Sequence, residues 1–208
     1  MAAGKTKSAV YFVSGSDEAS VKKAASGLAA ELAPGADAFG LETIDGAVET
    51  VDAATSRINQ ARQAVLTMPF LGGTKLVWLK NASFLADTIV GRSETVQSAL
   101  EALCETLGEG LPDGVQFLMS APEADKRRTA YKTLGKLGTT QIHDKPDLGF
   151  RAGEEEVVSW TAGRAREVGV LLTRDGLEAL AARVGLEVRQ LDNELEKLLT
   201  AFGSGHKV

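Results

Sequence analysis

The residues of this sequence that could bind a nucleotide phosphate lie near its start. The tripeptide Gly4-Lys5-Thr6 matches the end of the motif G-x-x-x-x-G-K-[ST], in which backbone amides and the lysine contact phosphates. It precedes the first predicted strand, however, and lacks the upstream glycine. The connection that follows this strand, GSDEASVK at residues 15–22, has one glycine and places two carboxylates where a triphosphate would lie. We therefore expect no nucleotide cofactor and no ATP hydrolysis.

Other reactive side chains do not form a recognisable site. Cys104, the one cysteine, lies in an apolar helical pattern and is expected to be a small core residue, so no disulfide can form within the chain. His143 and His206 are distant in sequence and have too few accompanying ligands to predict a metal site. The strand predicted at residues 115–119 is followed by residues 120–122 (SAP), without an acidic pair that could hold magnesium.

An apolar segment, TMPFLGG at residues 67–73, lies between a predicted helix and a predicted strand. Connections of this kind normally lie at the surface and are normally polar. Proline lacks an amide hydrogen and should end the helix, and the glycines loosen the backbone that follows. The segment either packs back against its own domain or projects into a pocket of another protein. Its candidate contact residues are Met68, Pro69, Phe70, Leu71 and Gly72.

The energy available from this segment is large enough to matter for binding. Burying one Leu- or Phe-sized side chain yields roughly 1.5–3 kcal/mol. A nanomolar contact totals about 12 kcal/mol, and a few anchor residues of this kind dominate interfaces. Phe70 and Leu71 together could therefore supply much of the affinity for a partner protein.

Basic residues gather in a helix predicted at residues 126–137. Lys126, Arg127, Arg128 and Lys132 are expected to fall mostly on one side of it. They either contact DNA phosphates or form a solvated face that neighbouring acidic residues partly balance. Both interpretations stay open.

These segments are positioned by strands that alternate with helices, which predicts an α/β fold with a parallel sheet flanked by helices. Strands are predicted at residues 9–13, 38–44, 76–79, 115–119 and 139–143, and helices at residues 18–32, 48–65, 94–107 and 126–137. From residue 154 onward only helices are predicted, at residues 154–168, 174–184 and 186–202. We place a boundary near residues 146–153, which gives an α/β domain (1–148) and a small three-helix lid domain (149–208).

The composition of the chain limits the kinds of protein and partner that can be expected. The chain has 208 residues, 44% of them hydrophobic and 25% charged, as in a globular protein. A formal charge of −5 gives no general attraction to nucleic acid, so any DNA contact requires a local basic patch. Residues 1–8 contain no apolar run of the length that a signal peptide or membrane span needs, and we expect a cytoplasmic protein.

The order and spacing of several segments resemble the delta subunit of the bacterial DNA polymerase III clamp loader, the subunit that opens the ring-shaped sliding clamp. The matching segments are VYFVSGSD (10–17), MPFLGGTKLVWLK (68–80), VQFLM (115–119), DKRR (125–128) and LDNELEKL (191–198). Family members typically carry P-L-F-G in the apolar loop, whereas here the two large residues are exchanged, as Phe70 and Leu71.

This resemblance implies an AAA+-like (RecA-like) domain with a degenerate phosphate loop and a helical lid. A third, C-terminal collar domain would be missing here, in line with the abrupt end at Val208. Met68, Phe70 and Leu71 would enter a pocket on the sliding clamp (the beta subunit). The partners would be this clamp, the other clamp-loader subunits, which bind ATP, and DNA only within the complex. The resemblance also implies a subunit without catalysis of its own, in a DNA polymerase III holoenzyme whose nucleotidyltransferase activity belongs to the complex.

Two other functions remain possible from the residues alone. One is an active P-loop ATPase with an atypical nucleotide loop. The other is a non-catalytic scaffold domain whose apolar loop packs inward. The exposure of the loop and the state of the first strand-to-helix connection discriminate between them.

Overall fold

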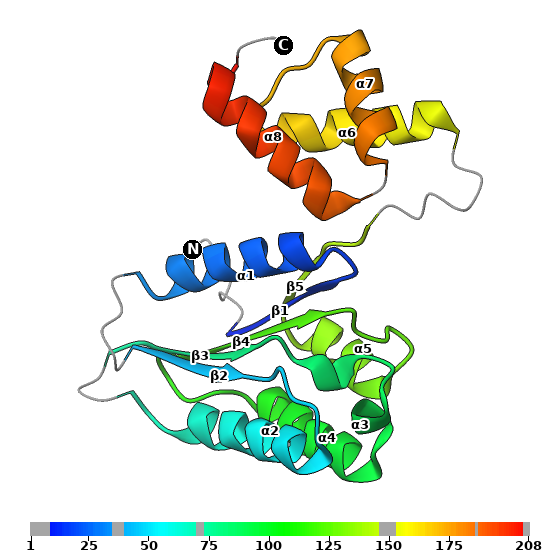
Figure 1. Ribbon diagram of the computed structural model, residues 1–208. Helices are drawn as coiled ribbons and strands as arrows, with labels where there is room; N and C mark the ends of the chain where they lie inside the picture. Colours follow the sequence, from blue (N-terminus) through cyan, green and yellow to red (C-terminus); the bar gives the residue numbers. More distant parts are fainter. Residues whose placement is uncertain (1–8, 35–39, 70–72, 146–152, 186, 206–208) are drawn as a thin grey trace. The chain divides into compact units, whose positions relative to one another are not determined.

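The computed structural model of the chain describes residues 9–34, 40–69, 73–145, 153–185 and 187–205. The chain divides into two compact units, Met1–Asp144 and Lys145–Val208. The first is an α/β unit and the second is helical (Figure 1). The boundary predicted near residues 146–153 falls on residues that are mostly outside this description.

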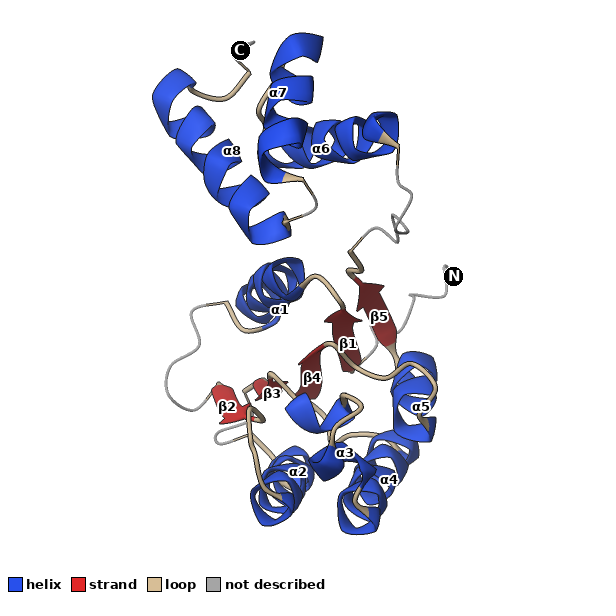
Figure 2. Cartoon of the chain, turned by 45° about the vertical axis from the view of Figure 1, so that its right-hand side comes forward, coloured by secondary structure: helices blue, strands red, loops and turns tan. Residues whose placement is uncertain are grey.

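A five-stranded parallel sheet forms the centre of the α/β unit, in the order β2-β3-β4-β1-β5 (Figure 2). The strands are β1 (Val10–Gly15), β2 (Leu41–Asp45), β3 (Lys75–Lys80), β4 (Val115–Pro122) and β5 (Thr139–Ile142). Strand β1 is buried along its whole length, because it is central and covered on both faces. The predicted α/β class with a parallel sheet is confirmed.

Helices cover both faces of this sheet (Figure 2). Helix α1 (Glu18–Leu32) packs on one face against a cluster that includes Tyr11, Leu76 and Trp78. The opposite face carries α2 (Val51–Leu66), α4 (Glu94–Glu109) and α5 (Thr129–Leu137), with the short segments η2 (Ser83–Leu85) and α3 (Ile89–Arg92) beside them. Phe84 and Leu85 of η2 are fully buried there.

Local capping decides where several of these helices begin and end. Asp17 caps α1, since its side chain accepts a hydrogen bond from the N–H of Ser20. Thr50 caps α2 in the same way. Val48, predicted to lie on the apolar face of that helix, therefore precedes it, although it still packs against the core. Helix α2 ends at Leu66, as the following proline predicted.

The predicted basic helix begins three residues later than expected. Helix α5 starts at Thr129, so Lys126, Arg127 and Arg128 lie in the turn before it and not on a helix face. The reason is local: the side chain of Asp125 accepts a hydrogen bond from the N–H of Arg127, and its carbonyl accepts one from the N–H of Arg128.

The helical unit is built from α6 (Glu154–Val168), α7 (Arg174–Val184) and α8 (Val188–Phe202). Its core is a small cluster of apolar side chains that includes Ala165, Val170 and Val184 together with Leu191 and Leu195 of α8. Helix α8 thus buries one apolar face, on which Leu191 and Leu195 lie one turn apart. Among the helices of the described residues, none has the length and apolar character needed to cross a membrane.

Candidate functional site

The two candidate sites lie at opposite ends of the parallel strands, one at the carboxyl ends and one at the amino ends. The β1–α1 connection, where a phosphate loop would be, follows the carboxyl end of β1. The α2–β3 loop, residues 67–74, precedes the amino end of β3. Because all strands point the same way, these connections are separated by the length of the strands. The two sites must therefore be considered independently.

The β1–α1 connection is only two residues long, Ser16 and Asp17, and its amides are already hydrogen-bonded. The N–H of Ser16 donates to Asp144 Oδ1 (3.2 Å), and the N–H of Asp17 donates to the carbonyl of His143 (3.0 Å). Asp17 in turn accepts from the N–H and the hydroxyl of Ser20 at 3.2 and 2.6 Å. A phosphate would find carboxylates here in place of free amide donors.

Asp144, the last residue of the α/β unit in sequence, lies beside this connection in space. Its carboxylate forms an ion pair with Lys126. Burial opposes ionisation of Asp144, but the hydrogen bonds from Lys126 and from the N–H of Ser16 outweigh it, so the pKa of this carboxyl is lowered. Lys126, a candidate DNA contact, is therefore engaged within the protein.

The α2–β3 loop begins with exposed apolar side chains. Leu66, the last residue of α2, is 55% exposed, and Met68 is 73% exposed. Pro69 is half-buried. The predicted tip residues Phe70, Leu71 and Gly72 lie outside the described residues. Single exposed apolar side chains are common on protein surfaces, and these two are of interest because they lead directly into the apolar segment that the sequence singled out.

The base of this loop is held by hydrogen bonds and close packing. Thr67 donates its N–H to the carbonyl of Ala64 and its hydroxyl to the carbonyl of Gln63, at 3.2 and 3.0 Å. The ammonium of Lys75, at the start of β3, also donates to the Ala64 carbonyl, at 2.9 Å. The loop therefore leaves from a well-fixed helix end.

The arginines of the basic cluster are bound to acidic residues that precede them. Arg127 donates to Asp125 Oδ1 (2.9 Å) and to Asp87 Oδ2 (3.2 Å). Arg128 is 13% exposed and donates to the carbonyl of Gly91. Hydrogen bonds from the side chain and the N–H of Arg127 lower the pKa of Asp125 to about 2. These arginines therefore form part of an ion-pair network with Asp87 and Asp125, in which the Arg127 side chain stays 79% exposed.

Asp87, the second acidic centre of this network, was not predicted from the sequence. Asp87 accepts from Arg92 Nε at 2.7 Å as well as from Arg127. The hydrogen bond from Arg92 is the largest reason that the pKa of Asp87 is lowered. No local pattern could have revealed the pairing, because Asp87 and Arg127 are 40 residues apart. Lys132, the last of the predicted basic residues, lies exposed on α5.

The thiol of the one cysteine is a further reactive group of the described residues. Cys104 is buried, and burial, with smaller contributions from Glu101 and Glu105, raises its thiol pKa to about 11. At neutral pH it is a protonated core residue, as predicted, and a poor nucleophile. Throughout the described ranges, no group of three or more His, Cys, Asp or Glu side chains could hold a metal ion.

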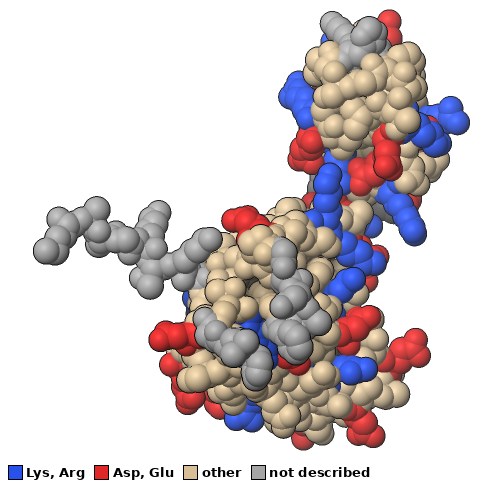
Figure 3. Space-filling view, turned by 90° about the vertical axis from the view of Figure 1, so that its left-hand side faces the viewer, with Lys and Arg blue, Asp and Glu red and all other residues tan. Residues whose placement is uncertain are grey.

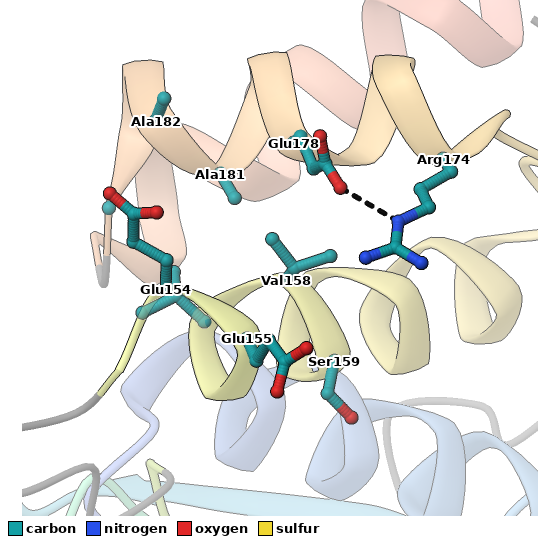
Figure 4. A pocket seen from close by; sticks show the side chains of 10 residues that line it. Glu154, Glu155, Val158, Ser159, Arg174, Glu178, Ala181 and Ala182 are labelled. Carbon is teal, nitrogen blue, oxygen red and sulfur yellow. Dashed lines mark hydrogen bonds and ion pairs between the residues drawn. The ribbon is translucent and has the colours of Figure 1, made fainter.

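One groove lies within the helical unit, between α6 and α7 (Figure 4). Its volume is about 850 Å³, and Val158 and Ala181 face each other across it. Glu154 and Glu155 lie on one side, and Glu178 on the other binds Arg174 at 2.8 Å. None of the predicted site residues lines this groove.

Surface charge does not mark either site. On the face shown in Figure 3, acidic and basic side chains are interspersed over the α/β unit. This mixture agrees with the modest net charge of −5. On this face, a nucleic-acid contact would have to come from individual side chains and not from a broad basic surface.

Comparison with known protein families and solved structures identifies proteins that are similar to this chain. The family model described as "DNA polymerase III, delta subunit" matches residues 11–143. The Bacillus subtilis DNA clamp loader delta protein (YqeN) is similar in structure, with a TM-score of 0.56 and 20% sequence identity. That similarity covers 97% of this chain but 56% of the B. subtilis chain, so the present chain spans just over half of its length.

A second solved structure, a DNA polymerase III gamma subunit-related protein from Thermotoga maritima, has a TM-score of 0.44 and 12% identity. The match between the two structures covers 94% of this chain and 75% of the T. maritima chain. No match was found among curated proteins. The resemblance inferred from the sequence is confirmed, as is an AAA+-like fold with a parallel sheet followed by a helical part. The family model spans well over half of the sequence, and this chain belongs to the DNA polymerase III delta subunit family.

Proposed function

We propose that this chain is part of a clamp-loader delta subunit that binds a ring-shaped sliding clamp through the α2–β3 loop and favours the open ring. The observation that carries the proposal is the exposure of Met68, 73%, at the start of that loop. Leu66 beside it is also exposed, so the approach to the tip is apolar on the outside of the protein. Such a surface gains free energy when a partner covers it.

The loop acts as a set of anchors in this proposal. Phe70 and Leu71 enter an apolar pocket on the clamp, with Met68, Pro69 and Gly72 shaping their approach. Binding opens a ring only if the open form binds more tightly than the closed form, because a ligand shifts an equilibrium only by its differential affinity. The subunit therefore has to contact a part of the clamp that differs between the two states.

The subunit itself performs no catalysis in this proposal. In the β1–α1 connection, the N–H of Ser16 donates its hydrogen bond to Asp144 and is not available to a phosphate. This arrangement supports a role without nucleotide hydrolysis and disfavours the ATPase alternative. Other clamp-loader subunits bind ATP, and DNA is contacted only in the assembled complex. The exposure of Met68 disfavours the alternative of a scaffold domain with an inward-packed loop.

The test is the affinity of the chain for the cognate sliding clamp, measured by surface plasmon resonance. Phe70→Ala and Leu71→Ala should each weaken binding by at least about 2 kcal/mol, or roughly 30-fold. Unfolding curves of both variants are recorded alongside, so that a loss of clamp contact is separated from a loss of folded protein.

Matched controls come from exposed apolar residues elsewhere. Ile89 of α3 is 88% exposed, and Leu171, between α6 and α7, is 45% exposed. Ile89→Ala and Leu171→Ala remove comparable apolar surface and should leave clamp affinity unchanged. A double variant of Phe70 and Leu71 that binds the clamp as well as the native chain would sink the proposal.

A further inference from the structure

Lys75 is a buried cation at the base of the α2–β3 loop. It is the first residue of β3, and its side chain is 10% exposed. Its Nζ lies 2.9 Å from Oε2 of Glu42 on β2 and donates to the Ala64 carbonyl of α2 at 2.9 Å. A buried ammonium is stable only with a counter-charge and hydrogen-bond acceptors. Here they come from two different elements, so the side chain ties both to β3.

The acceptor on α2 lies where the helix needs a donor. Ala64 is in the last turn, whose carbonyls have no partner within the helix. This turn, which is fully described, contains no Lys or Arg, so the cation that favours the negative helix end comes from Lys75 on another element. The N–H of Thr67 donates to the same carbonyl at 3.2 Å. The end of the helix, the start of the loop and the start of β3 thus meet at one oxygen.

The turn before β4 holds the other side of the loop base. Gly114 has a φ of +78°, and a Cβ placed on it would lie 2.7 Å from the Gly73 carbonyl oxygen and 3.4 Å from Cγ of Pro69. The carbonyl of Gly114 accepts the N–H of Lys75 at 2.8 Å. The two described residues that flank the tip, Pro69 and Gly73, therefore both lie against this glycine, and Lys75 is bonded to it as well.

We infer that Lys75, paired with Glu42, is a positioning residue for partner binding. It fixes the direction in which the loop leaves the sheet, so that presenting the apolar tip costs less conformational entropy on binding. It needs no contact with the partner, because its side chain is buried. The inference rests on the proposed function and adds to it a determinant of affinity outside the contact residues.

The experiment compares the native chain with Lys75→Met, Lys75→Arg and Glu42→Gln in clamp binding and in amide hydrogen exchange without clamp. Methionine has a similar length and no charge. It leaves Ala64 with the Thr67 donor and leaves Glu42, whose side chain is 39% exposed, in reach of water. We expect Lys75→Met to fold, to exchange faster over residues 65–76, and to bind about tenfold more weakly.

Arginine keeps donors for both partners, so Lys75→Arg should stay within about twofold of the native affinity. Glu42→Gln keeps an acceptor but removes the counter-charge, and should fall between the native chain and Lys75→Met. Val21→Ala is the control for general loss of stability, since Val21 is buried in α1 on the other face of the sheet. It should lower stability without changing clamp affinity or exchange at the loop.

The outcomes separate this inference from the proposed function. If the native chain binds the clamp and Lys75→Met binds equally well, the positioning role is overturned and the proposed function stands. If Val21→Ala weakens binding as much as Lys75→Met, the effect is one of stability and the role is again overturned. A native chain that does not bind the clamp overturns both. Rescue by Lys75→Arg, together with faster exchange confined to the loop ends in Lys75→Met, supports the role.

Discussion

The carboxylate of Asp144 accepts a hydrogen bond from the backbone N–H of Ser16, with 3.2 Å between Oδ1 and N. Ser16 lies directly after β1, where phosphate-binding proteins of this layout offer amides to a nucleotide. Asp144 is the last residue of the α/β unit. The Asp144 carboxylate thus already accepts the hydrogen bond from the amide that a nucleotide phosphate would need.

Nucleotide binding should therefore be undetectable. A titration with a fluorescent ATP analogue and magnesium should show no saturable binding below on the order of 1 mM, because the amides of Ser16, Asp17 and Ser20 are all engaged. Asp144→Asn should give the same result, since Asp17 remains in place. Micromolar affinity in the native chain would contradict this arrangement and would restore the ATPase alternative.

Gly15 should not tolerate a side chain, whereas Gly27 should accept one. A Cβ on Gly15, whose φ is +150°, would overlap the backbone carbonyl of His143 on the neighbouring chain segment. Gly15→Ala should lower the free energy of unfolding by more than about 2 kcal/mol. Gly27 lies inside α1 with open space around its Cβ position, so Gly27→Ala should raise stability by about 0.5–1 kcal/mol. Urea unfolding of both variants checks the pair, and equal effects would refute it.

The sheet and its helices were predictable because their signals are local. The apolar run before Gly15 marks a strand buried on both faces, and it is buried at every position. Asp17 and Pro69 set the start of one helix and the end of another through capping and the missing amide hydrogen. The exposed Met68 of the apolar loop also belongs to this class, since its position between a helix and a strand is visible in the sequence.

The ion pairs were not predictable because their partners are brought together only by the fold. The prediction of one basic helix face was wrong, since hydrogen bonds from Asp125 hold Arg127 and Arg128 in a turn. Nothing near Lys75 in the sequence indicates that it binds Glu42 and the carbonyl of Ala64. Such contacts depend on parallel strand pairing and helix packing, which join residues distant in the chain.

Asp125 should make stability depend on pH in the acid range. Its pKa is about 2 in the folded protein, because Arg127 donates side-chain and backbone hydrogen bonds to it, against an ordinary value of 3.8. The folded pKa lies below the unfolded one, so the stabilisation is fully present above about pH 4–5 and is lost as pH falls toward 2. Thermal unfolding should show Asp125→Asn as less stable than the native chain at pH 7, and the difference should shrink below pH 4.

Arg127→Gln serves as the partner control for this prediction, because it removes the side-chain hydrogen bonds to Asp125 and keeps the one from the backbone N–H. The difference in stability between Arg127→Gln and the native chain should shrink over the same acidic pH range. A difference for Asp125→Asn that stays constant from pH 7 to pH 2 would show that the carboxylate is not stabilised by Arg127.

Arg164 and Asp192 join α6 to α8 through a bidentate ion pair. Nε donates to Oδ1 and Nη2 donates to Oδ2, each at 2.7 Å, and the side chains are 16% and 26% exposed. Asp192 belongs to the LDNELEKL segment that carries part of the family resemblance, and no local pattern there indicates Arg164 as its partner. Glu194 of the same segment pairs along its own helix with Lys197, at 2.9 Å. Asp192 thus adds a polar link between α6 and α8 to the apolar core that they share.

A double-mutant cycle of Arg164→Ala and Asp192→Ala should give a coupling of about 1 kcal/mol or more, because the planar guanidinium matches the carboxylate and both are mostly shielded from water. The control cycle uses Arg174 and Glu178, whose side chains are 79% and 50% exposed and should couple by at most about 0.5 kcal/mol. Unfolding of the helical unit can be followed by Trp160 in a Trp78→Phe background, since Trp160 packs against the core of that unit. Arg164→Lys keeps the charge but not the two parallel hydrogen bonds, so it should lose most of the coupling. Equal coupling in the two cycles would mean that burial and bidentate geometry add nothing to this pair.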